Sequence, residues 1–200
     1  SIRANLDEVR ARAGGSVEIL AASKYVAAEE MGALAEAGIT LVGENRLQDL
    51  EQKRERWADA FTWDFIGSIQ SRKVKRITDQ VRLVHSLCTD SALGKLNGLE
   101  PDPEREVLVQ VNVAGEDSKE GLDPEDLASF IARCPVRVSG LTTMPPFATD
   151  PEQSRPYFAR LAELAAEHGL ERLSMGTSQD WPVAVEEGAT IIRVGTNLFR

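Results

Sequence analysis

Residues 173–194, LSMGTSQDWPVAVEEGATIIRV, contain the pattern that decides the fold. A short apolar run at 173–176 leads through Thr177-Ser178 into an amphipathic segment that ends near Glu187, and a second apolar run follows at 190–194. Short apolar runs on either side of a helical pattern are typical of a βαβ unit with parallel strands. This stretch therefore predicts a strand, a helix and a strand in direct succession.

The same alternation extends back to the N-terminus, where Ile2, Leu6 and Val9 share one helical face. Strands are expected at residues 17–22, 41–43, 61–66, 81–87, 106–112, 136–142, 173–176 and 190–194. Helices are expected at residues 27–37, 44–57, 70–79, 91–96 and 178–187, and behind Asp123-Pro124 and Asp150-Pro151. In those two pairs the Asp is placed to cap a helix and the Pro to occupy its first position.

Eight strands, each except the last followed by a helical pattern, predict an α/β fold that closes into a (β/α)8 TIM barrel. We expect a single domain over residues 1–200, because no linker or low-complexity segment divides the chain. The alternative is an open doubly wound sheet of the Rossmann type. No Gly-x-Gly-x-x-Gly motif follows the first strand, which weakens that alternative.

Composition excludes several classes of function. A net charge of −9 argues against a nucleic-acid surface. Cys88 and Cys134 have neither the spacing of metal ligands nor the number that a disulfide framework needs. No apolar run approaches the roughly 20 residues that span a bilayer, and the sequence does not start with a signal-peptide pattern. We therefore expect a cytoplasmic protein, a monomer or weak dimer, with no membrane or nucleic-acid partner.

Lys24 directly follows the first apolar strand, at 17–22. The chemistry of a β/α barrel lies at the C-terminal ends of its strands, so Lys24 is expected on that face. Partial desolvation at a strand end favours a neutral amine, which can attack an aldehyde and form an imine. The alternative is a lysine whose amine extends into solvent.

Two glycine-containing turns on the last two strands are candidate anion-binding elements. Gly176-Thr177-Ser178 precedes a helix, and Gly195-Thr196 follows the last strand. Both can offer backbone N–H groups and a hydroxyl to a phosphate, and neighbouring late strands carry the usual phosphate site of these barrels. Alternatively, Ser178 only caps the helix, with Asp180 in its first turn, and Gly195 is a turn residue.

Arg193 lies in a buried apolar run and must find a partner there. One interpretation is an ion pair with Glu44, which could instead pair with Lys24; the other is a donor to a ligand. Asn45 can contact a ligand or cap the following helix. His85 is interpreted as structural, because no carboxylate and nucleophile stand beside it in a triad-like motif.

Across essentially its whole length the chain resembles the pyridoxal 5′-phosphate (PLP) homeostasis protein family, also called proline synthetase co-transcribed homologs. The motifs that carry the resemblance are Ala22-Ser23-Lys24, Val42-Gly43-Glu44-Asn45, Asp64-Phe65-Ile66-Gly67, Gln70-Ser71, Val111-Asn112, Lys119-Glu120-Gly121, Gly140-Leu141, 173–178 and Arg193-Val194-Gly195-Thr196. The family is similar in fold to the barrel domain of alanine racemase. The resemblance therefore implies a fold-type III PLP site.

By position in these motifs, Lys24 resembles the lysine that forms a Schiff base with PLP. The resemblance implies that Ser178, Gly195 and Thr196 bind the phosphate, together with the Thr177 amide. It also implies that Arg193 faces the pyridine nitrogen and that Asn45 lies beside the ring.

The chain departs from the family pattern at the pocket wall and at the end of the barrel. Asp64 and Ser68 stand where histidine and proline or histidine are common, and Thr142 and Thr177 each replace a methionine. Tyr25-Val26-Ala27 follows the lysine where the family often has proline, and Leu198-Phe199-Arg200 stands where Phe-Gly and a short tail are usual. Lys24 and the phosphate elements are intact.

The expected function is PLP homeostasis without catalysis. PLP enzymes need an electron sink and a proton shuttle, and a charged Arg193 at the ring nitrogen would weaken the sink. Related racemases add a tyrosine from a second domain. Here Tyr25 is expected on the other side of its strand, and Tyr157 lies in a helix away from the rim. We expect PLP to be held and exchanged, with PLP-dependent apo-enzymes as transient recipients.

Three alternatives remain open at the level of sequence. The first is an amino-acid racemase that borrows a base from a partner subunit. The second is a class I aldolase that uses Lys24 on a sugar phosphate, and the third is a scaffold barrel that binds no PLP. A further hypothesis is that Lys119 receives PLP during transfer.

Overall fold

The fold is a closed barrel of parallel strands, seen in a computed structural model that describes residues 1–117 and 120–200. The strands are β1 (Glu18–Ala22), β2 (Leu41–Glu44), β3 (Thr62–Phe65), β4 (Leu83–Leu87), β5 (Glu106–Gln110), β6 (Arg137–Thr142), β7 (Arg172–Ser174) and β8 (Ile191–Val194). Each strand pairs in parallel with its neighbours in chain order, and β8 pairs with β1 to close the sheet. The predicted TIM barrel is confirmed, and the Rossmann alternative is wrong.

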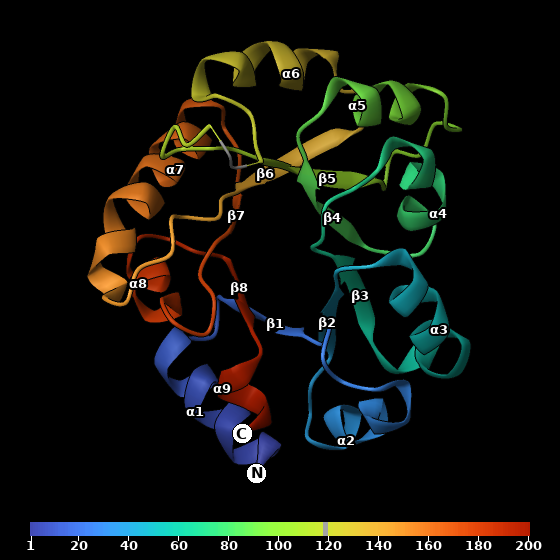
Figure 1. The fold of residues 1–200 in the computed structure, drawn as a ribbon, viewed down its shortest axis with the longest axis vertical. Helices are drawn as coiled ribbons and strands as arrows, with labels where there is room; N and C mark the ends of the chain where they lie inside the picture. The colour runs from blue at the N-terminus through green and yellow to red at the C-terminus, as the bar shows by residue number, and fades with distance from the viewer. Residues whose placement is uncertain (118–119) are drawn as a thin grey trace.

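Helices surround the barrel on its outside (Figure 1). They are α1 (Ile2–Ala13), α2 (Met31–Glu36), α3 (Leu47–Trp57), α4 (Val74–Thr78), α5 (Asp90–Asn97), α6 (Leu127–Arg133), α7 (Arg155–Glu167), α8 (Trp181–Glu186) and α9 (Thr196–Phe199). Short 3-10 turns stand at Ala28–Glu30, Ala58–Ala60, Ser71–Lys73, Pro124–Asp126 and Pro151–Ser154. Within the described residues, none of the helices combines the length and apolar character that crossing a bilayer requires.

Several helices begin later than the sequence pattern predicts. The helix expected from Ser178 begins at Trp181, whose N–H donates to the Thr177 carbonyl at 2.9 Å at the end of a preceding turn. The helix expected from Glu44 begins at Leu47, because Glu44 continues β2 and pairs with Phe65. The last strand, expected to have no helix behind it, leads into the short helix α9.

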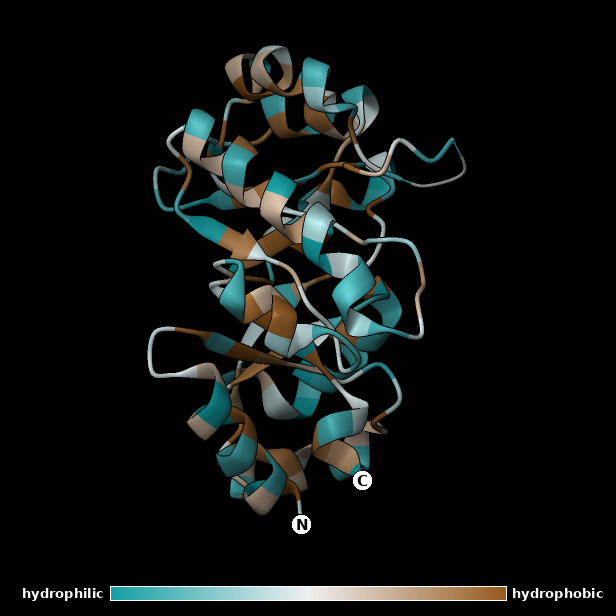
Figure 2. Cartoon of the chain, turned by 90° about the vertical axis from the view of Figure 1, so that its left-hand side faces the viewer, coloured by the Kyte–Doolittle hydropathy of each residue, from teal (hydrophilic) through white to brown (hydrophobic). Residues whose placement is uncertain are grey.

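The core has two layers. Inside the barrel, Leu20, Leu41, Leu83, Leu108 and Ile191 form a compact apolar cluster, each at most 5% exposed. A larger layer lies between the strands and the helices. Figure 2 shows apolar residues along the central strands, with polar and apolar residues alternating along the surrounding helices. This alternation is the amphipathic pattern from which the helices were predicted.

The two ends of the chain lie together (Figure 1). The Asn5 side-chain amide in α1 donates to the Leu198 carbonyl at 2.9 Å and to the Arg200 carbonyl at 2.8 Å. The first helix therefore holds α9 and the residue behind it against the C-terminal end of β8.

Candidate functional site

All seven residues predicted for the ligand site line one cavity of about 500 Å³ at the C-terminal ends of the strands. They are Lys24, Asn45, Thr177, Ser178, Arg193, Gly195 and Thr196. A volume of about 300–1,000 Å³ is usual for sites of small ligands. The residues come together because β1, β2, β7 and β8 end on the same rim of the barrel.

Lys24 is exposed, and the expected partial desolvation of its amine is wrong. β1 ends at Ala22, so Lys24 lies beyond the strand, in a turn closed by the Val26 N–H and the Ser23 carbonyl at 2.9 Å. The Lys24 ammonium lies over the Tyr25 ring, 4.9 Å from its centroid. Tyr25 also lines the cavity, so the prediction that it points away is wrong too, because strand alternation has ended before it.

Glu44 pairs with Lys53, and the alternative in which it pairs with Arg193 or Lys24 is wrong. The Lys53 amine lies 2.7 Å from Glu44 Oε1 and 2.7 Å from the Ser23 carbonyl oxygen. The Ser23 hydroxyl donates to the other oxygen of Glu44. Lys53 comes from the middle of α3 and gave no signal in the sequence beyond its place in a helical segment.

The two predicted phosphate elements are in direct contact. The Gly195 N–H donates to Ser178 Oγ at 3.0 Å, so the turn after β7 meets the turn after β8. The Thr177 N–H donates to Asp180 Oδ1 at 2.8 Å, and Asp180 stands at the N-cap of α8. Ser178 is therefore not the helix cap, and its hydroxyl faces the Gly195-Thr196 corner.

Arg193 is 7% exposed and bonds neutral groups. Its guanidinium donates to Thr142 Oγ1 at 2.7 Å and to the Thr143 carbonyl at 3.2 Å, and lies 3.2 Å from the Met144 sulfur. Among the described residues, no carboxylate forms an ion pair with it. Burial lowers the pKa of Arg193 to about 10, so the side chain stays charged at neutral pH.

Asn45 contributes a buried polar atom that lacks a partner. Its Oδ1 makes no hydrogen bond with any described residue. Its position depends on Gly67, where an added Cβ would lie 2.0 Å from the Asn45 carbonyl oxygen. Buried polar atoms are almost always satisfied, so a ligand group is a natural partner for Asn45.

His85 stands between a carboxylate and a hydroxyl that its sequence context did not indicate. Its Nε2 lies 2.9 Å from Asp64 Oδ2, and its Nδ1 lies 2.8 Å from Ser174 Oγ. Burial lowers the pKa of His85 more than the Asp64 carboxylate raises it. All three residues are at most 1% exposed inside the barrel, so substrate cannot reach them and the arrangement is structural. The sequence could have indicated this contact only through the strand alternation that places Asp64, His85 and Ser174 inside the barrel.

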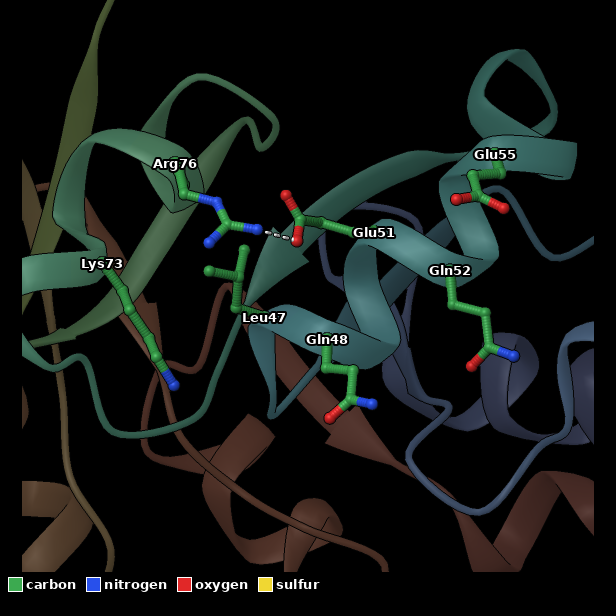
Figure 3. A pocket seen from close by; sticks show the side chains of 7 residues that line it. All are labelled: Leu47, Gln48, Glu51, Gln52, Glu55, Lys73 and Arg76. Atoms are coloured by element: carbon green, nitrogen blue, oxygen red, sulfur yellow. Dashed lines mark hydrogen bonds and ion pairs between the residues drawn. The ribbon is translucent and has the colours of Figure 1, made fainter.

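A second hollow lies on the outside of the barrel between α3 and α4 (Figure 3). Glu51 and Arg76 form an ion pair across it, and Lys73 points away from that pair. Its other lining residues are Leu47, Gln48, Gln52 and Glu55. The hollow has no buried unpaired donor or acceptor among the described residues, so the cavity at the barrel mouth is the better candidate site.

The residues at the barrel mouth fit PLP. Lys24 offers an amine for an aldehyde, and the Ser178–Gly195 corner offers a hydroxyl and the start of α9 to a phosphate. Arg193 offers a buried donor to a ring nitrogen, and Asn45 has an unsatisfied atom. These groups are chemically suited to the aldehyde, the phosphate and the pyridine nitrogen of PLP.

Comparisons with known proteins relate the whole chain to one family. Residues 1–200 match the family described as alanine racemase, N-terminal domain. A pyridoxal phosphate homeostasis protein of Aquifex aeolicus is 39% identical over 201 residues, covering 94% of this chain and 88% of that protein. PipY of Synechococcus elongatus, solved without and with PLP, is 30% identical over 100% of both chains, with TM-scores of 0.87 and 0.85. Alanine racemase of Corynebacterium glutamicum, 15% identical, covers 99% of this chain and 60% of its own with a TM-score of 0.78, and shares the fold.

Proposed function

The chain belongs to the family of pyridoxal phosphate homeostasis proteins, and on that premise we propose that it binds PLP covalently on Lys24 and exchanges it without catalysis of its own. The observation that carries the proposal is the single cavity that collects an amine, an anion corner and a buried guanidinium. The structure of PipY with PLP bound, over the full length of a 30% identical chain, supports the choice of ligand.

Each residue of the cavity has a role in this proposal. The Lys24 nitrogen bonds to the aldehyde carbon of PLP, and the aldehyde oxygen leaves as water. Ser178, Gly195 and Thr196 hold the phosphate, whereas the Thr177 N–H is engaged by the Asp180 carboxylate at 2.8 Å and is not a free donor. Arg193 faces the pyridine nitrogen, and Asn45 lies beside the ring. These contacts supply the local positive potential that a net charge of −9 does not provide.

The groups around the ring support exchange over catalysis. PLP supplies an electron sink when its ring nitrogen is protonated. Arg193 is buried and charged, so it disfavours a second positive charge on that nitrogen. Release then proceeds when an incoming amine attacks the carbon bonded to Lys24 and the lysine leaves as an amine.

Racemization of an amino acid is the second candidate function, and Tyr25 is the observation that favours it. Its ring lines the cavity beside Lys24. A racemase needs a second proton-transfer group across the cofactor from the lysine, whereas Tyr25 is adjacent to Lys24 and 86% exposed. Exchange is therefore the better-supported function.

The absorption spectrum of the purified protein with added PLP tests the proposal. We expect a visible band from the bond to Lys24, absent in Lys24→Ala and retained in a control variant, Lys73→Ala, which changes a lysine of the outer hollow. A protein that stays colourless with PLP contradicts the proposal. Loss of chirality from L-alanine in the presence of PLP would instead support the racemase.

Exchange requires recipients, and we propose PLP-dependent apo-enzymes in the cytoplasm. Both cysteines are free, which accords with a reducing compartment. Lys119, the hypothetical acceptor during transfer, lies outside the described residues. Unchanged PLP release kinetics in Lys119→Ala would discard that hypothesis.

A further inference from the structure

The turn that carries Lys24 is fixed through its first residue, Ser23. Ser23 is 0% exposed, and its carbonyl accepts from the Val26 N–H at 2.9 Å and from the Lys53 amine at 2.7 Å. Its hydroxyl donates to Glu44, and its N–H donates to the Gly43 carbonyl at 3.2 Å. Every polar group of Ser23 is therefore engaged. Among the described residues, the Lys24 ammonium forms no hydrogen bond or ion pair and lies over the exposed ring of Tyr25.

Glu44 and Lys53 form the ion pair beneath that turn. Their charged atoms lie 2.7 Å apart, and the side chains are 0% and 5% exposed. Among the described residues, each is the other's only ionic partner. Glu44 is the last residue of β2, and Lys53 lies in the middle of α3. Side chains from β2 and α3 thus converge on Ser23, the residue that follows β1.

A buried ion pair contributes little net stability, so its presence indicates another role. Desolvation of two charges offsets most of their attraction, and an apolar pair of similar size is often as stable. What charged groups add is directional hydrogen bonding. Here that bonding ends on Ser23, one residue before the proposed reactive amine. The Lys24 amine, on a four-carbon side chain, can reach the aldehyde only if the Lys24 Cα is held at a suitable distance from the bound ligand.

We infer that Glu44 and Lys53 are positioning residues that hold the Ser23-Lys24 turn so that the Lys24 amine meets the aldehyde of a bound pyridoxal phosphate. This role rests on the proposed function. The pair touches neither the phosphate corner nor Arg193, so it acts on formation of the covalent bond and leaves non-covalent recognition of the ligand intact.

The test compares two ligands that differ at the aldehyde. PLP can bond to Lys24, whereas pyridoxine 5′-phosphate has an alcohol at that carbon and cannot. In Glu44→Gln/Lys53→Met, which removes both charges at nearly constant volume, the Kd for PLP should rise about tenfold, and the Kd for pyridoxine 5′-phosphate should stay within about twofold. Visible absorption and calorimetry give the two constants.

Leu50→Ala is the matched control, because Leu50 is 0% exposed on the same helix and does not contact Ser23 through a hydrogen bond. It should lower the melting temperature without changing the ratio of the two Kd values. If the double variant does not fold, Ser23→Ala is the second variant. It removes the hydrogen bond from the Ser23 hydroxyl to Glu44 and keeps the Glu44–Lys53 ion pair. It should raise the Kd for PLP about threefold and leave pyridoxine 5′-phosphate binding unchanged.

Equal weakening of both ligands in a folded variant would overturn the positioning role, and so would an unchanged Kd for PLP. In both cases the wild-type protein still shows its visible band, and the proposed function stands. A wild-type protein without a band overturns the proposed function, and the positioning role with it.

Discussion

At His85, burial and the Asp64 carboxylate act on the imidazole in opposite directions, and burial prevails, so the pKa of His85 lies below its ordinary 6.5. Below about pH 6.5 the unfolded chain therefore takes up a proton that the folded chain refuses. The free energy of unfolding should therefore decrease as the pH is lowered through this window, by up to about 1.4 kcal/mol per pH unit. Urea unfolding of the wild type and His85→Gln, at about pH 7.5 and about pH 5.5, measures it. An equal pH dependence in both proteins would contradict the prediction.

Seven of the fourteen residues that line the cavity were predicted from sequence, whereas the contacts that hold them were not. Lys24, Ser178 and Gly195 follow strands, and the barrel brings strand ends to one rim. The partners of Glu44 and His85 depend on how elements pack. Ser174 is 89 residues from His85 in the sequence, and no spacing rule connects them. The exposure of Lys24 was mispredicted because Lys24 lies two residues beyond the end of β1, in a turn that the strand pattern did not indicate.

Gly176, in the turn between β7 and α8, has no room for a side chain. Its φ is +96°, and an added Cβ would lie 2.7 Å from the Ala184 Cβ and 2.9 Å from the Trp181 Cα. Gly176→Ala should combine backbone strain with overpacking and destabilise the protein by about 2–4 kcal/mol. Thermal melting measures the loss. Because the turn carries Ser178, PLP binding should weaken as well.

Gly169→Ala is the matched control for that prediction. Gly169 also has a positive φ, +66°, but an added Cβ meets nothing within 4 Å. It should cost only the backbone strain, about 1 kcal/mol. If the two variants melted at the same temperature, crowding at Gly176 would have no part in the turn's stability.

Strands were easier to predict than helix boundaries, for a physical reason. A strand buried on both faces is a continuous apolar run, and each of the eight runs became a strand. Helix starts depend on caps and on where a strand stops. Four of the expected helices instead begin with 3-10 turns, at Ala28–Glu30, Ser71–Lys73, Pro124–Asp126 and Pro151–Ser154. Asp123 makes no side-chain cap bond, whereas the Asp150 carboxylate accepts from the Glu152 N–H at 3.0 Å. Periodicity alone does not distinguish these tight turns from α-helix.

At the scale of the whole molecule, the segment that follows β8 forms one wall of the site, and α1 supports it from outside. Phe199 and Arg200 line the cavity, and Asn5 holds this segment through two hydrogen bonds, of 2.9 Å and 2.8 Å. Asn5→Ala should lower the free energy of unfolding by about 1–2 kcal/mol. It should also raise the Kd for PLP, because the start of α9 loses its support.

Asp7→Ala, on the exposed face of the same helix, controls for general effects on α1. Surface ion pairs such as that of Asp7 with Arg10 contribute at most about 1 kcal/mol, so this variant should keep both stability and the Kd for PLP near wild type. Urea unfolding and titration of the visible band measure the two quantities on the same samples. If Asn5→Ala lost stability but bound PLP with unchanged affinity, the chain ends would close the barrel without shaping its site.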